Sequence, residues 1–110
     1  MVQLFVNLVL GILIWLPVLA IAQGTDYTLT IKDHKFIPEA LSIPAGQKIK
    51  ILIENQDPSP EEFESYELNR EKVIAAHGKV IVYVGPLNPG TYQFMGDFHQ
   101  DTARGAIVAQ

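Results

Sequence analysis

The chain has 110 residues, a formal net charge of −4 and no cysteine. A chain of this length forms one domain by default, and its hydrophobic content of 48% is that of a globular protein. The negative charge argues against nucleic-acid binding, which needs a basic face. The missing cysteines exclude disulfides, thiolate nucleophiles, cysteine-ligated zinc and iron–sulfur clusters.

The first 25 residues carry no charged side chain, and residues 8–21 are nearly all apolar. An apolar core followed by the small residues Ala20 and Ala22 is typical of a secretory signal peptide. We therefore predict a signal peptide over residues 1–22, cleaved after Ala22, and an exported domain over residues 23–110 in a bacterial periplasm. The alternative is an uncleaved membrane anchor, because about 20 apolar residues are enough to span a bilayer.

Short apolar stretches recur along the rest of the chain, with glycine and proline turns between them. Apolar and polar side chains alternate over residues 27–32 and 49–53, which predicts half-buried strands. Residues 80–84 are apolar on both faces and predict a buried strand. Further short strands are predicted near 41–43, 92–94 and 106–109. Strands at this spacing with such punctuation predict an all-β sandwich or barrel.

The segment 59–76 leaves two alternatives open. Ser59, Pro60 and Glu62 match a helix N-cap, a first-turn proline and the acid that closes a capping box. We expect a loop or one helical turn at 59–62, followed by extended chain from about Phe63. The alternative is a short helix within 59–76, around residues 69–75.

Four stretches of the sequence, in their order along the chain, resemble the cupredoxin family of small copper-carrying β-sandwiches. They are FIPEALSIPAGQKI, ENQDPSPEEF, VYVGPLNPGTYQF and the closing GAIVA. The resemblance covers nearly all of the predicted exported domain and implies a Greek-key β-sandwich. It also implies that any metal site lies at the end of the sandwich formed by the 55–63 loop and the 96–103 loop.

The residues at the four usual ligand positions differ from the family pattern. The cysteine position aligns with Gly96, the second histidine with His99, and the methionine with Thr102 or Ala103. A carboxylate, Glu61, stands where the first histidine is usual. A blue copper centre is therefore excluded, because its strong copper–sulfur bond needs a cysteine.

With its carboxylates, the sequence is similar to the cysteine-lacking cupredoxins that accompany bacterial ferrous iron permeases. EEFESYELNREKV and FMGDFHQDTARG carry this closer resemblance. It implies a periplasmic protein that binds copper or iron, assists iron uptake beside a membrane permease or another periplasmic iron-binding protein, and at most acts as a ferroxidase. A metal-free module that only binds a protein partner is the alternative, and a stand-alone electron carrier ranks last.

The candidate metal ligands are Glu61, Glu62, Met95, Asp97 and His99. Neutral imidazole suits copper, iron, zinc and nickel, whereas carboxylates shift the preference towards harder ions. Adjacent residues of an extended chain point in opposite directions, so we expect only one of Glu61 and Glu62 to point inward. For the same reason Met95 and Asp97 are expected on the face opposite to Gly96.

The other two histidines, His34 and His77, lie in predicted turns, where solvated side chains are the simpler interpretation. Glu64, Glu67 and Glu71 are interpreted as a solvated acidic face. Such a face also raises the local concentration of cations. No phosphate-binding loop and no nucleophile with an adjacent base is present in the sequence, so no hydrolytic or transferase site is predicted.

Overall fold

The computed structural model describes residues 27–110, so the predicted signal peptide lies outside the described residues. Within residues 27–110, no helix is both long enough and apolar enough to cross a membrane.

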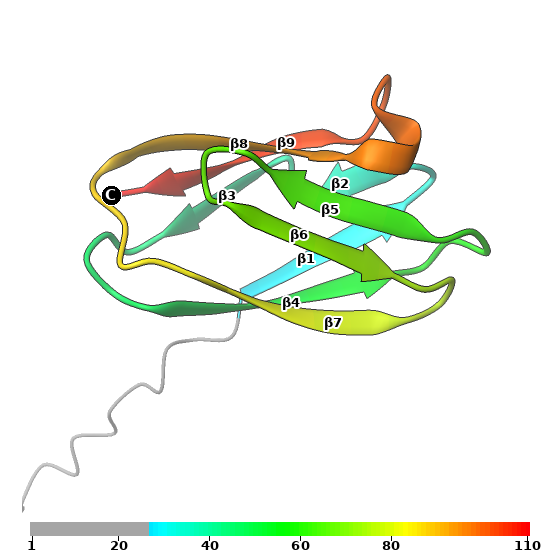
Figure 1. Ribbon diagram of the computed structural model, residues 1–110, viewed down its shortest axis with the longest axis horizontal. Coiled ribbons are helices and arrows are strands. Elements are labelled where there is room, and N and C mark those ends of the chain that lie inside the picture. Colours follow the sequence, from blue (N-terminus) through cyan, green and yellow to red (C-terminus); the bar gives the residue numbers. More distant parts are fainter. Residues whose placement is uncertain (1–26) are drawn as a thin grey trace, which may run out of the picture.

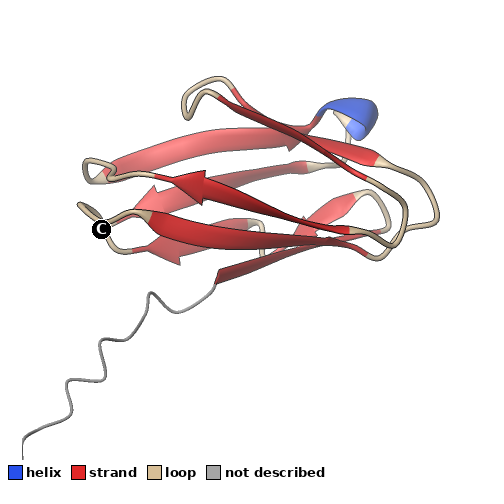
Figure 2. Cartoon of the chain, turned by 60° about the horizontal axis from the view of Figure 1, so that its bottom comes forward, coloured by secondary structure: helices blue, strands red, loops and turns tan. Residues whose placement is uncertain are grey.

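The described chain forms strands that pack as two sheets face to face (Figure 1). The strands are β1 (Tyr27–Lys32), β2 (Lys35–Ile37), β3 (Ala40–Ile43), β4 (Ile49–Asn55), β5 (Glu61–Ser65), β6 (Arg70–Ile74), β7 (Lys79–Val84), β8 (Gly90–Gly96) and β9 (Arg104–Ala109). One 3-10 turn, η1 (Asp97–His99), follows β8 directly and is the helical element that Figure 2 shows in blue.

The first sheet has the strand order β2-β1-β4-β7, and the second has the order β3-β9-β8-β5-β6. The pairs β1–β4 and β3–β9 are parallel, and the other neighbours are antiparallel. These connections cross repeatedly between the sheets. They confirm the predicted all-β sandwich.

The core forms where the alternating apolar residues of the two sheets meet. Leu29 and Ile31 of β1 are fully buried, as are Ile51 and Ile53 of β4. This outcome confirms the period-two interpretation of both segments.

Three phenylalanines fill one part of this core. The ring of Phe36 meets those of Phe94 and Phe63 edge-on, with centroids 4.8 and 6.2 Å away. Edge-to-face pairs of this kind add stabilisation beyond burial of apolar area. The cluster fixes how β2, β5 and β8 stack, and therefore fixes the end of the sandwich next to it.

The short helix considered for residues 59–76 is wrong, because this segment forms β5, a turn and β6 (Figure 1). The side chains of β5 alternate between buried and half-buried, so Phe63 is buried while Tyr66, beyond the strand, is 74% exposed. Phe63 pairs with Gly96 of β8 and with Lys72 of β6. These long-range pairings override the local capping pattern of Ser59 and Pro60, since helix propensity is a weak prior.

Candidate functional site

Glu61 lies at the start of β5 and points into the end of the sandwich. It faces the same way as Phe63, two residues further along the strand, and is 1% exposed. Across the sheet, β8 ends at Gly96 and the chain turns through η1, which brings His99 over Glu61. The pair therefore depends on the register between β5 and β8, in which Phe63 lies opposite Gly96.

The carboxylate of Glu61 is bound at both oxygens. Its Oε2 lies 2.5 Å from Nδ1 of His99. Its Oε1 accepts hydrogen bonds from the backbone N–H groups of Phe98, at 2.9 Å, and of Glu62, at 3.0 Å. A buried carboxylate with three partners is a satisfied group, so Glu61 holds His99 in one orientation.

The second ring nitrogen of His99, Nε2, has no hydrogen-bond partner among the described residues. No buried side-chain nitrogen or oxygen in residues 27–110 lacks a partner, so Nε2 is accessible to solvent. The His99 side chain is 25% exposed, against 1% for Glu61. A carboxylate on one ring nitrogen and an open second nitrogen is the arrangement in which histidines usually bind metals.

A copper site of the usual cupredoxin kind does not fit these residues. A Cβ placed on Gly96 would lie 2.6 Å from Cδ of Glu61 and 2.7 Å from Cβ of Ala103. The carboxylate of Glu61 therefore occupies the space into which a cysteine side chain would extend. Of the two residues that the methionine position could align with, Ala103 is fully buried and has no ligand atom, and the hydroxyl of Thr102 donates to the carbonyl oxygen of His34.

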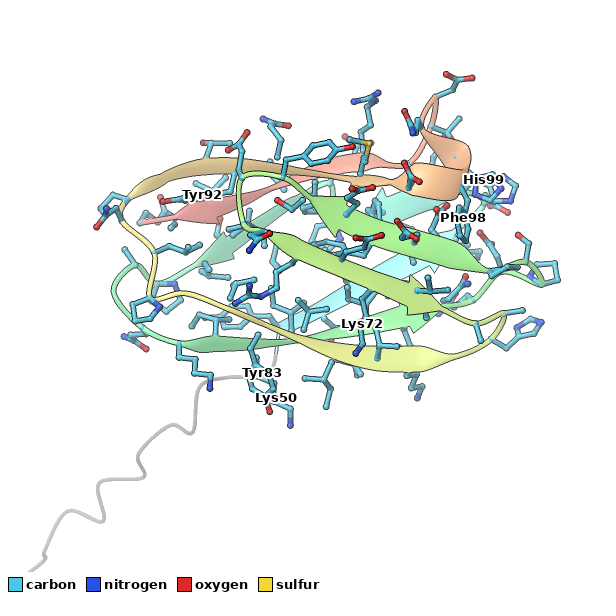
Figure 3. All side chains as sticks on the ribbon, viewed as in Figure 1. Lys50, Lys72, Tyr83, Tyr92, Phe98 and His99 are labelled. Atoms are coloured by element: carbon cyan, nitrogen blue, oxygen red, sulfur yellow. The ribbon has the colours of Figure 1, made fainter. Side chains whose placement is uncertain are left out.

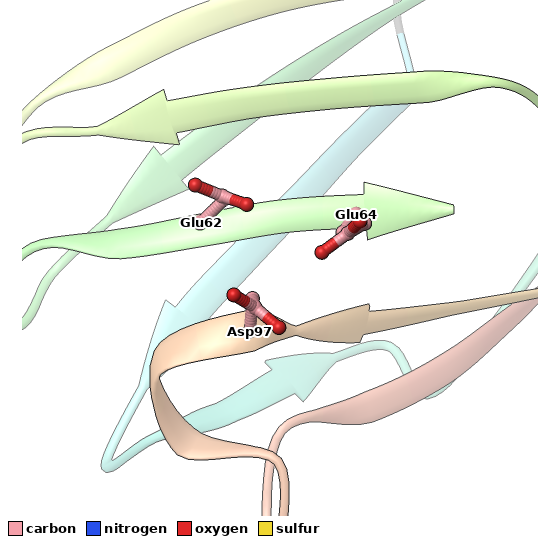
Figure 4. Close-up of side chains that lie close together, drawn as sticks. All are labelled: Glu62, Glu64 and Asp97. Atoms are coloured by element: carbon pink, nitrogen blue, oxygen red, sulfur yellow. The ribbon is translucent and has the colours of Figure 1, made fainter. Parts of the chain in front are cut away.

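A second set of carboxylates lies on the outer face of the same sheet. Figure 4 shows Glu62 and Glu64 on β5 with Asp97 of η1 beside them. One oxygen of each lies within 4.8 Å of the others, and no other group of three His, Asp or Glu residues in the described chain does so. Carboxylates so close could hold a hard cation, but exposed acids often gather without one.

Neighbouring carboxylates perturb the pKa values of Glu62 and Glu64. A hydrogen bond with Glu71, then burial, then the charges of nearby carboxylates raise the pKa of Glu62 to about 7. Burial, followed by the charges of Asp97 and Glu71, raises the pKa of Glu64. Both shifts show a crowded negative surface.

The structure separates the five predicted ligands into two groups. Glu61 and His99 meet in the end of the sandwich. Glu62 and Asp97 lie on the outer face, as does the half-buried Met95, which pairs with Glu64 across the sheet. The predicted opposition of Glu61 and Glu62 is observed, because strand geometry directs their side chains to opposite faces.

His34 was interpreted as a solvated turn residue, and the structure places it in the site instead. Its ring stacks on that of His99, with centroids 3.5 Å apart and planes 13° from parallel. His77, the other turn histidine, is exposed. One feature of the sequence could have drawn attention to His34. A two-residue turn such as Asp33-His34 usually has asparagine or glycine at these positions, so a histidine there is unusual.

Comparison with known proteins gives both a family and a curated relative. Residues 5–109 match the model of the cupredoxin-like domain family. The uncharacterized protein RP394 of Rickettsia prowazekii (strain Madrid E) is 47% identical over 83 residues, which are 76% of this chain. The aligned region covers 66% of that protein, so this chain spans about two thirds of its relative's length.

Solved structures share the fold at low identity. The metal-binding domain of the Cu(I)-exporting P-type ATPase of Streptococcus pneumoniae, solved with Cu(I), has a TM-score of 0.71 and 14% identity, covering 80% of this chain and 88% of its own. Auracyanin A, a blue copper protein of Chloroflexus aurantiacus, has a TM-score of 0.66 and 13% identity, covering 78% and 98%. With the family match over residues 5–109 and the two-sheet sandwich, these likenesses lead to one conclusion: the chain belongs to the cupredoxin-like domain family.

Proposed function

We propose that this protein is a periplasmic metal-binding cupredoxin that assists bacterial iron uptake, with His99 as its central ligand. One observation carries the proposal: Glu61 fixes His99 through Nδ1 and leaves Nε2 open to solvent. Metal-binding histidines commonly have such a carboxylate partner on the other nitrogen, which orients the ring and raises its basicity. In this role Glu61 positions the ligand and does not itself bind the ion.

Among divalent first-row metal ions, Cu(II) is expected to bind most tightly, because it has the highest affinity in their general order. A copper ion held at His99 supplies one-electron redox chemistry, which is the basis for expecting ferrous iron oxidation beside an iron permease. The outer carboxylates Glu62, Glu64 and Asp97 attract cations to the same end of the sandwich, because a patch of one sign raises the local counter-ion concentration. The iron and permease roles rest on the resemblance of the sequence alone.

Calorimetric titration of the full chain, purified in mild detergent, tests the metal site. Wild type should bind one Cu(II) per chain, and His99→Ala should abolish this binding. The variant His99→Gln keeps an amide that can donate to Glu61, so it separates loss of the ligand from loss of folding. The matched control changes Glu62 and Glu64 to Gln and Asp97 to Asn, and should keep the Cu(II) site while weakening any binding of harder ions.

The second candidate is a metal-free module that binds a membrane permease or another protein. It is favoured by the packing around Glu61, because this carboxylate already has three partners and fills the space next to Gly96. Wild type that gives no heat above background with Cu(II), Fe(II) or Fe(III) would leave this candidate alone. Iron uptake in a deletion strain, complemented with wild type or His99→Ala, then tests the physiological role in either case.

A further inference from the structure

His34 brings a second imidazole to the end of the sandwich that holds His99. Figure 3 shows His99 there beside Phe98. The ring of His34 comes from the turn between β1 and β2 and stacks on His99 at a centroid distance of 3.5 Å. The one hydrogen bond of this ring among the described residues is a long one, 3.4 Å from Nε2 to the hydroxyl of Ser59.

The backbone of His34 is held far more firmly than its ring. Asp57, which is 6% exposed, accepts hydrogen bonds from the N–H groups of Asp33, at 2.8 Å, and of His34, at 3.0 Å. The hydroxyl of Thr102 donates to the carbonyl oxygen of His34 at 2.7 Å. Thr102 belongs to the loop that also carries His99, so the turn and the loop are tied together.

The turn itself places two non-glycine residues in the left-handed region. Asp33 and His34 have φ angles of +53° and +56°, a conformation that is uncommon for residues with a side chain, although aspartate and histidine adopt it more often than most. Glycine or asparagine would form the same two-residue turn at lower cost. What distinguishes His34 from His77, which has a similar φ, is that this turn places its ring against that of His99.

We propose that His34 is the second imidazole ligand of the metal site, with Nε2 of His99 as the first. The proposal rests on the proposed function, since it presumes a metal at His99. An imidazole binds a cation in the plane of its ring, so two stacked rings must tilt apart to share one ion. The weakly held ring of His34 can make this rotation, while Glu61 keeps His99 fixed.

Two imidazoles also define the class of metal. Nitrogen ligands of this kind suit Cu(II), Zn(II) and Ni(II), whereas Ca²⁺, Mg²⁺ and other hard cations prefer oxygen. The inner site is therefore expected to bind borderline divalent ions, and the outer carboxylates of Glu62, Glu64 and Asp97 to attract hard ones. Ala103 and Gly96 offer no side-chain ligand atom, so the two imidazoles would be the protein's ligands on this side of the site.

The test uses His34→Gly, which removes the ring and suits the left-handed backbone. The full chain in detergent is titrated with Cu(II), and the bound copper is examined by electron paramagnetic resonance, which reports how many nitrogens bind it. We expect the affinity for Cu(II) to fall at least about tenfold. Removing a residue that only supports a metal ligand already lowers metal affinity by about 10- to 100-fold, and a direct ligand should matter at least as much. The spectrum should lose the coupling to one nitrogen, and the melting temperature without metal should not fall.

His77→Gly is the matched control, because His77 also has a positive φ, +55°, and is exposed in another turn. It should bind Cu(II) as wild type does. Wild-type affinity and an unchanged spectrum in His34→Gly, with binding lost in His99→Ala, would overturn the role of His34 and leave the proposed function intact. Equal weakening in His77→Gly would also overturn it. Absence of Cu(II) binding in wild type would instead remove the proposed function and this inference together.

Discussion

The contact between buried Glu61 and partly exposed His99 predicts that Glu61→Gln destabilises wild type but stabilises the His99→Ala variant. In wild type, Glu61→Gln replaces a charge-assisted hydrogen bond, but the amide oxygen can still accept from the backbone N–H groups of Phe98 and Glu62. His99 is partly exposed and tolerates the loss of its anionic partner. We expect this variant to lower the free energy of unfolding by about 1 kcal/mol, at the low end for hydrogen bonds to charged groups.

Removing the other partner is more damaging. His99→Ala leaves the Glu61 carboxylate, 1% exposed, without the hydrogen-bond partner of its Oε2. Leaving a buried acceptor unsatisfied costs about 1–3 kcal/mol and more for a charged group, and the two backbone hydrogen bonds that remain place the loss near 3 kcal/mol. In that background, Glu61→Gln replaces the buried carboxylate by a neutral amide and should raise stability by about 1–2 kcal/mol. Contacting residues often show coupling of this size.

Urea unfolding followed by far-UV circular dichroism at pH 7.5 measures all four proteins of this cycle. His77→Ala, at an exposed turn, is the control for a histidine without a buried partner and should change stability by less than about 0.5 kcal/mol. The reasoning is refuted if Glu61→Gln is destabilising in both backgrounds, or if His99→Ala is no worse than His77→Ala.

Three further predictions concern Gly96, Glu62 and Asp57. Gly96→Ala should lower the free energy of unfolding by about 1–3 kcal/mol through overpacking against Glu61, and a thermal melt unchanged from wild type would contradict the packing. Because the pKa of Glu62 is raised from 4.5 to about 7, its contribution to stability is full below pH 4.5 and is lost as the pH rises to about 7. Glu71→Gln should reduce this loss. The melting temperature of the variant minus that of wild type should therefore be larger at pH 8 than at pH 4.5. An equal difference in melting temperature at the two pH values would contradict the raised pKa of Glu62. Burial alone would raise the pKa of Asp57, but the N–H groups of the β1–β2 turn lower this pKa below 3.8 on balance. The Asp57 carboxylate therefore contributes its full stabilisation above pH 3.8 and loses it as the pH falls further. Asp57→Asn should flatten acid unfolding in this range, and an unchanged acid limb would show that the carboxylate is not responsible.

Sequence patterns predicted the architecture well, because local alternation reflects which face of a strand is buried. Residues 27–32 and 49–53 formed strands with their apolar side chains inside. The secondary structure of the segment after Ser59 was harder to predict, because its first residues match the pattern of a helix N-terminus. Its strand depends on pairing with β8, some 30 residues later in the chain, and a local pattern does not contain that pairing.

The candidate site also depended partly on the sequence and partly on the tertiary structure. The sequence by itself determined that no cysteine is available for a blue copper centre and, through its resemblance to the cupredoxins, that a carboxylate and His99 stand at ligand positions. It also predicted that Glu61 and Glu62 face opposite ways if their segment is extended. Only the tertiary structure decided that Glu61 is the inward one, that it fills the space beside Gly96, and that His34 reaches His99. The physical reason is that strand periodicity fixes alternation along one segment, whereas the contacts between segments follow from the register and stacking of the two sheets.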